Sequence, residues 1–164
     1  MSTTKMVFSS LLIAIVIIIE TVVVYTGESL VAITILSTIP IYIICRIDIL
    51  IGWLAFLAVG ILLLILSPHQ MMFFICTNGL IGASLGISKV KTNSFIIQST
   101  ASSVLLFFGL TIIIGVLGIE SAIYKHWYYI VALVTFCFAY CSLFNFMLSK
   151  IYVFIKRVTK LEIL

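Results

Sequence analysis

Polar and ionisable side chains that interrupt long apolar stretches are the first candidates for chemistry in this sequence. Glu20 lies near the end of the first apolar stretch, and Asn78 lies inside a later one. A carboxylate or an amide within a membrane is costly unless it faces protein, water or a ligand. The sequence therefore indicates two interpretations of Glu20 with equal weight: a ligand-binding residue, or an acid at the lipid–water interface.

Further candidates lie in the connections between helices, at the ends of the predicted helices that lie on the same side of the membrane as Glu20. A pocket for a small molecule is mostly apolar, with a few placed polar groups and aromatic walls. The predicted ligand-binding residues are Glu20, His69, Gln70, Asn78, Glu120, Tyr124, His126 and Trp127, with Phe74 as a further wall. Two alternatives stay open: His69 as a solvated turn residue, and the Tyr and Trp side chains as an aromatic belt at the membrane interface.

Motifs for catalysis are absent from the sequence. It contains no P-loop, no HExxH and no GxSxG, and its acids and histidines lie mostly at helix ends rather than at one depth. Two histidines in separate connections, and four cysteines without a CxxC motif, do not form a metal-binding pattern. We therefore expect a protein that is not an enzyme and that holds no metal or other cofactor.

The composition is that of an integral membrane protein. Of the 164 residues, 64% are hydrophobic and 9% are charged, whereas a soluble domain has about 25% charged residues. The mean hydropathy is +1.41. The basic residues fall between apolar runs, which indicates a role in membrane topology rather than in binding nucleic acid. One domain, residues 1–164, is expected.

The apolar runs predict an all-α fold with six transmembrane helices. Pro40 is expected to kink the second helix, because proline removes a backbone donor. The third helix, with Gly60, is expected to face lipid. The predicted spans are Met6–Tyr25, Leu30–Cys45, Ile49–Leu66, Met71–Ser88, Ser94–Gly118 and Trp127–Phe154.

The basic residues predict the orientation of these helices. If both termini are cytoplasmic, eight Lys and Arg residues lie inside and only Lys125 lies outside. Such an excess of inner positive charge is typical of membrane proteins. The turn from Ser67 to Gln70 is then outside, and a multi-pass protein of a bacterial cytoplasmic membrane is expected. The protein is therefore expected to contact membrane lipid.

Small residues in the fourth predicted span suggest a helix-packing surface. Gly79 and Ala83, like Gly82 and Gly86, are four residues apart. This spacing lets two helix backbones approach closely in a membrane. The surface could pack within the bundle or, with the basic cytoplasmic side, dock another membrane protein.

The sequence from residue 30 to residue 91 resembles that of a known family. It comprises ILSTIPIYIICRIDILIGWLAFLAVGILLLIL, with a proline in the second helix and a short charged turn, and then SPHQMMFFICTNGLIGASLGI, with glycines after an outer proline turn. With six spans and cytoplasmic termini, it is similar to the S components of energy-coupling factor (ECF) transporters and to the related YybS-like (DUF2232) membrane proteins.

This resemblance implies a substrate-binding subunit that captures a vitamin or similar micronutrient outside the cell. It also implies partners: a transmembrane coupling subunit and cytoplasmic ATPases. Many S components carry an Ala-xxx-Ala face on the first helix for docking. Here that register contains Ser10, Ala14 and Ile18, so only Ala14 matches. The alternative function is a non-transport membrane partner, such as an assembly, immunity or regulatory subunit.

Overall fold

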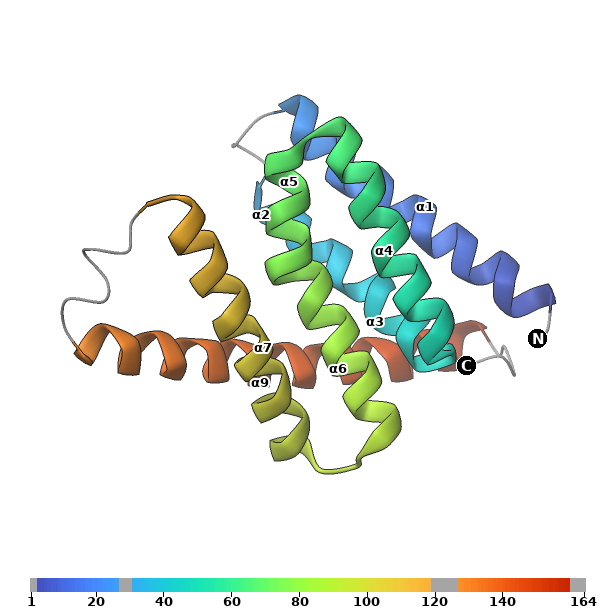
Figure 1. Ribbon diagram of the computed structural model, residues 1–164. Helices are drawn as coiled ribbons and strands as arrows, with labels where there is room; N and C mark the ends of the chain where they lie inside the picture. Colours follow the sequence, from blue (N-terminus) through green and yellow to red (C-terminus); the bar gives the residue numbers. More distant parts are fainter. Residues whose placement is uncertain (1–2, 27–30, 119–126, 160–164) are drawn as a thin grey trace.

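The computed structural model describes residues 3–26, 31–118 and 127–159, and every regular element in these ranges is helical (Figure 1). Five of its helical segments are long and apolar enough to cross a membrane, and a sixth, Ile35–Ile47, is apolar but shorter. The predicted all-α, multi-pass architecture is therefore confirmed. The α-helices are α1 (Thr3–Thr26), α2 (Val31–Thr34), α3 (Thr38–Ile47), α4 (Ile49–Leu66), α5 (Pro68–Phe73), α6 (Gly79–Lys91), α7 (Phe95–Val116) and α9 (Trp127–Thr159).

The second segment is broken rather than continuous. A 3₁₀ turn, η2 (Ile35–Ser37), separates α2 from α3. Pro40 lies in the first turn of α3, where its missing N–H would have bonded to the carbonyl of Leu36. The predicted kink at Pro40 thus takes the form of a tighter turn one helical turn before the proline. It leaves the Thr34 side chain at the broken end of a helix.

The fourth segment is also divided. Ser67 caps α5 by accepting a hydrogen bond from the Gln70 N–H at 3.4 Å, and Pro68 occupies the first helical position, which suits a residue without an N–H. A π-helical turn, η3 (Phe74–Asn78), joins α5 to α6. The segment therefore runs from Pro68 to Lys91, three residues longer at each end than the predicted Met71–Ser88. Isolated π turns are frequent at functional sites.

Glycines on α6 let it lie against α3. A Cβ atom at Gly82 would come within 2.7 Å of the Thr38 carbonyl oxygen, and one at Gly86 would come within 2.8 Å of the Tyr42 carbonyl oxygen. Only glycine allows backbones to approach this closely. The contact between α3 and α6 forms the centre of the bundle. Thr34 precedes α3 in its segment and Asn78 precedes α6, so this contact also fixes the distance between Thr34 and Asn78.

The third span packs more closely than the sequence suggested. Gly60 was expected to face lipid, but it is buried, and a Cβ atom there would lie 3.0 Å from Ile75 Cδ1 of η3. Only one side of α4 is exposed, with Leu54, Leu57 and Ile61 on it. The prediction was wrong for Gly60 because a nearly uniform run of apolar residues does not indicate which side faces protein.

The last two helices form the other side of the molecule. Helix α7 follows α6 after a short turn, and Figure 1 shows α9 crossing behind α7 and α6. Gly109 of α7 lies so close to the Cys76 backbone that a Cβ atom would collide with it. Helix α9 meets α3 near its end, where the Arg46 guanidinium lies 3.6 Å from the centre of the Tyr152 ring.

Candidate binding pocket

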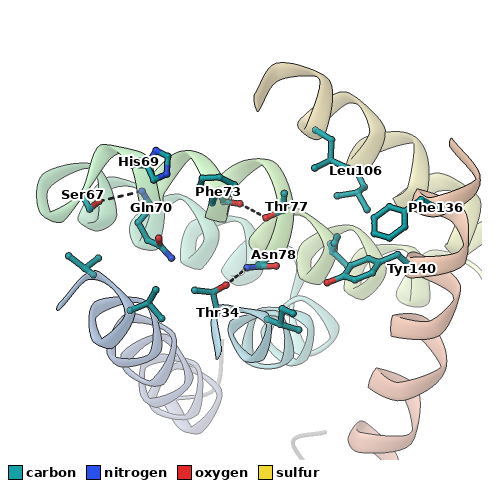
Figure 2. A pocket seen from close by; sticks show the side chains of 15 residues that line it. Thr34, Ser67, His69, Gln70, Phe73, Thr77, Asn78, Leu106, Phe136 and Tyr140 are labelled. Carbon is teal, nitrogen blue, oxygen red and sulfur yellow. Dashed lines mark hydrogen bonds between the residues drawn. The ribbon is translucent and has the colours of Figure 1, made fainter. Parts of the chain in front are cut away.

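A pocket of about 710 Å³ lies between the first part of the chain and helices α7 and α9. Helices α1, α2, α5 and α6 with η3 form one side, and α7 and α9 form the other (Figure 2). The lining is largely apolar, with hydroxyl, amide and imidazole groups on the side of α2, α5 and η3 and the Tyr140 hydroxyl on the side of α9. Its residues include Thr34, His69, Gln70, Phe73, Asn78, Leu106, Phe136 and Tyr140.

The Glu20 carboxylate lies directly behind the pocket wall. Its side chain is fully buried on α1, and the Gln70 amide nitrogen donates a hydrogen bond of 2.8 Å to Glu20 Oε2. Ser37 lies beside the carboxyl group. Glu20 Oε1 is sealed from solvent and has no hydrogen-bond partner among the described residues. Gln70 itself lines the pocket, so it separates the carboxylate from the cavity.

Asn78 and Thr34 form a second polar pair on the same wall. The Asn78 amide nitrogen donates to Thr34 Oγ1 at 2.8 Å, and both side chains line the pocket. The pair joins the last residue of η3 to the break between α2 and α3. Figure 2 shows this bond, with the Asn78 oxygen directed away from Thr34 and toward Tyr140.

Aromatic rings from α9 form the facing wall. Phe136 and Tyr140 are one turn apart and stack with their centres 5.8 Å apart and their planes 25° apart. Tyr140 also contacts Phe144 at 4.6 Å, which extends the row of rings along α9. At the rim, the exposed His69 ring meets Phe73 edge-on at 4.9 Å. The pocket therefore has a polar wall and an aromatic wall.

The structure brings together four of the predicted ligand-binding residues and not a fifth. His69, Gln70 and Asn78 line the pocket, and Glu20 is bonded to Gln70 behind it. Trp127 begins α9 with 75% of its surface exposed, and it is not part of the pocket lining. The other three, Glu120, Tyr124 and His126, lie outside the described residues.

One predicted wall residue is replaced by its neighbour. Phe74 does not line the cavity. Instead it is fully buried, with its ring stacked on Phe56 of α4 at 5.7 Å. Phe73 faces the pocket instead, because successive residues on a helix point about 100° apart. The sequence identified the correct turn but not which of two adjacent rings faces inward.

The predicted packing residues fall into two groups. Gly79, Gly82, Ala83 and Gly86 are all buried, and they lie where α6 meets its neighbours inside the bundle. Ala14 is exposed on the outer side of α1. The small residues of α6 are thus used within the chain, and the α1 residue is the one left accessible from outside.

A second group of buried polar residues was not predicted as a site. Asn145 of α9 is fully buried, and its amide nitrogen lies 3.1 Å from both Gln98 Oε1 and Ser99 Oγ on α7. The Gln98 amide nitrogen in turn donates to the Thr92 carbonyl at 2.6 Å. The signal for this group was present: Asn145 is an amide within an apolar span, and such a residue needs a polar partner.

Neither a metal-ligand cluster among the described residues nor a known relative identifies the role of these sites. In the described ranges, no three His, Cys, Asp or Glu side chains come together as metal ligands would. The chain matches no protein-family model, no curated protein and no solved structure. The pocket geometry is therefore the main guide to function.

Proposed function

We propose that this chain is a membrane protein that binds a small molecule from the outer side, as the substrate-binding S component of an ECF-type importer does. The observation that carries the proposal is the pocket between the two sides of the bundle. Its volume of about 710 Å³ lies within the range of about 300–1,000 Å³ that is usual for ligand sites. Its apolar lining with a few placed polar groups is also of the kind that such sites use.

The distribution of charge supports an outward-facing pocket. Arg46 precedes the α3–α4 turn, and Lys89 and Lys91 precede the α6–α7 turn. No Lys or Arg lines the pocket in the part of the chain that the structure describes. Figure 1 shows the α4–α5 turn, where His69 and Gln70 lie, at the opposite end of the bundle from the α3–α4 turn. Positive charge favours the cytoplasmic side, so this pocket end would face outward in the cell membrane.

Cysteine labelling tests this orientation. His69→Cys and Lys91→Cys place one exposed thiol at each end, and the four native cysteines are buried. An impermeant maleimide applied to intact cells should label position 69 and spare position 91, with the wild type as the blank. Labelling of position 91 alone would place the pocket on the cytoplasmic side and contradict the proposal.

Extraction of bound molecules tests the binding itself. We expect mass spectrometry of the purified protein to find a small molecule that wild type retains. Leu110→Trp fills the pocket wall on α7, whereas Ile112→Trp lies on the exposed side of the same helix. The molecule should be lost from the first variant and kept by the second.

Copurification of partner proteins tests the transport role separately. An S component should also copurify with a coupling subunit and ATPases from its native membrane. A retained molecule without these partners would leave a binding protein that is not an importer subunit. A chain that retains no molecule would instead favour the alternative, a partner subunit of another membrane complex.

A further inference from the structure

The polar wall of the pocket has a defined hydrogen-bonding direction at Gln70. The Gln70 amide turns its nitrogen toward the Glu20 carboxyl group, to which it donates a hydrogen bond of 2.8 Å. Gln70 Oε1 is then left on the other side of the amide group. Among the described residues, no donor reaches this oxygen, and it is not sealed from solvent. The wall therefore presents an acceptor at this point.

Asn78 presents a second acceptor on the same wall. Its nitrogen is engaged by Thr34 Oγ1, and Oδ1 has no donor in the described ranges. Figure 2 shows this oxygen directed into the space between Asn78 and Tyr140. Two amide groups held by their nitrogens thus turn two carbonyl oxygens toward one cavity. Behind them lies the Glu20 carboxyl group, and no Lys or Arg of the described residues lines the cavity.

The facing wall suits a flat or cationic group. The stacked rings of Phe136 and Tyr140 line this side of the cavity, and aromatic faces attract ammonium groups as well as planar rings. Leu106 and Leu110 of α7 and Ile81 of α6 complete the apolar lining.

We propose that the pocket selects a compact apolar or planar molecule that carries hydrogen-bond donors, an amine or ammonium group above all, and discriminates against an anion of the same shape. This inference rests on the proposed binding function and adds the chemical class of the ligand. Donors on the molecule meet Gln70 Oε1 and Asn78 Oδ1, and a positive charge gains further from the aromatic faces of Phe136 and Tyr140. Glu20 is a positioning residue in this scheme, because it orients Gln70 rather than touching the ligand.

Three naphthalene probes of nearly equal size test the inference. 1-Naphthylmethylamine carries an ammonium group, 1-naphthamide carries neutral donors, and 1-naphthoate carries an anion. Their binding to the purified protein is measured by calorimetry, with protein-free micelles as the blank. We expect the order amine, amide, naphthoate, with the amine bound at least tenfold more tightly than naphthoate. This ranking uses the wild-type protein and needs no variant to fold.

Variants then locate the source of the preference. Glu20→Gln replaces the carboxyl group with an amide that can donate as well as accept, and this frees the Gln70 amide to turn, so the amine-to-naphthoate ratio should fall to within about threefold. Asn78→Leu should weaken amine and amide binding together. Thr111→Val, on α7 and outside the pocket lining, should leave the ratio unchanged. A purely structural role for Glu20 would lower stability without moving this ratio.

The outcomes separate this inference from the proposed function. Equal affinities for the amine and naphthoate would overturn the inference and leave the proposed function standing. Failure of all three probes to bind the folded wild-type protein would overturn the inference and count against the binding function too. An unchanged ratio in a folded Glu20→Gln protein would remove Glu20 from the selection.

Discussion

Two asparagines lie inside the bundle, and the contrast between them shows what a buried amide can do in a membrane protein. Asn78 gives its nitrogen to Thr34 and turns its oxygen to a cavity. Asn145 directs its nitrogen to Gln98 and Ser99, and its oxygen is sealed without a partner among the described residues. The residue type is the same, so the neighbouring space decides whether the amide can serve a ligand or only joins two helices.

The helical segments that carry the two asparagines also differ, because one is irregular and the other is continuous. Asn78 ends a π-helical turn and faces the broken segment α2–α3, so two irregular elements meet at the pocket. Asn145 lies within the continuous α9 and faces the continuous α7. Irregular backbone at membrane depth is tolerated where it is buried in protein or lines a cavity, and here it carries Asn78, the amide that faces the cavity.

Two groups of polar residues can therefore be compared. We call the residues around Asn78 the pocket group (Glu20, Gln70, Asn78 and Thr34) and the residues around Asn145 the sealed group (Gln98, Ser99, Ser102 and Asn145).

The largest expected difference comes from making the same change in both groups. Asn145→Asp would place a carboxylate against Gln98 Oε1 and Ser99 Oγ, with no cavity beside it, and should lower the free energy of unfolding by about 3 kcal/mol, as expected for an unpaired buried charge. Asn78→Asp would face the pocket and its water, and should cost only about 1 kcal/mol. Melting temperatures in detergent at neutral pH measure both. Equal losses would mean that the two asparagines have the same surroundings.

A smaller effect is expected from the helix contact that supports the pocket group. Gly86→Leu pushes α6 away from the Tyr42 backbone of α3, which should cost about 2 kcal/mol through overpacking. It should also weaken binding of 1-naphthylmethylamine, because α3 and α6 continue the segments that carry Thr34 and Asn78 of the polar wall. Gly60→Leu meets only the end of the Ile75 side chain and should cost about 1 kcal/mol. A Gly86→Leu protein with wild-type melting temperature would contradict the close approach.

The sequence indicated Glu20, Gln70 and Asn78 of the pocket group as site residues but no member of the sealed group, for a physical reason. Asn78 sits beside four small residues that mark a packing surface, and Glu20 is the one acid in the first span. The polar first half of α7 was visible in the sequence, but its partner Asn145 is 47 residues from Gln98. Which polar groups meet across such a distance depends on how α9 crosses α7, and no local pattern encodes that crossing.

The same limit applies to the fold: local sequence predicts some of its features, and others depend on contacts between distant residues. The helical spans follow from composition, and Pro40 predicts a break near the place where η2 forms. No local signal marked the π turn at Phe74–Asn78, whose first residue packs against the distant Phe56 of α4. The exposed side of α4 was equally undetermined, because its apolar residues surround the helix.

The smallest expected effect separates two serines of the sealed group. Ser99 accepts a hydrogen bond from Asn145, so Ser99→Ala should lower the free energy of unfolding by about 0.5–1 kcal/mol. Ser102 Oγ is sealed without a partner among the described residues, so Ser102→Ala removes an unsatisfied group. This change should leave stability unchanged or raise it by up to about 1 kcal/mol. Melting temperatures of the two variants, compared with wild type, give the sign. If Ser102→Ala lowers the melting temperature as much as Ser99→Ala, the Ser102 hydroxyl is hydrogen-bonded in the folded protein, and it is then not the unsatisfied group of the sealed group.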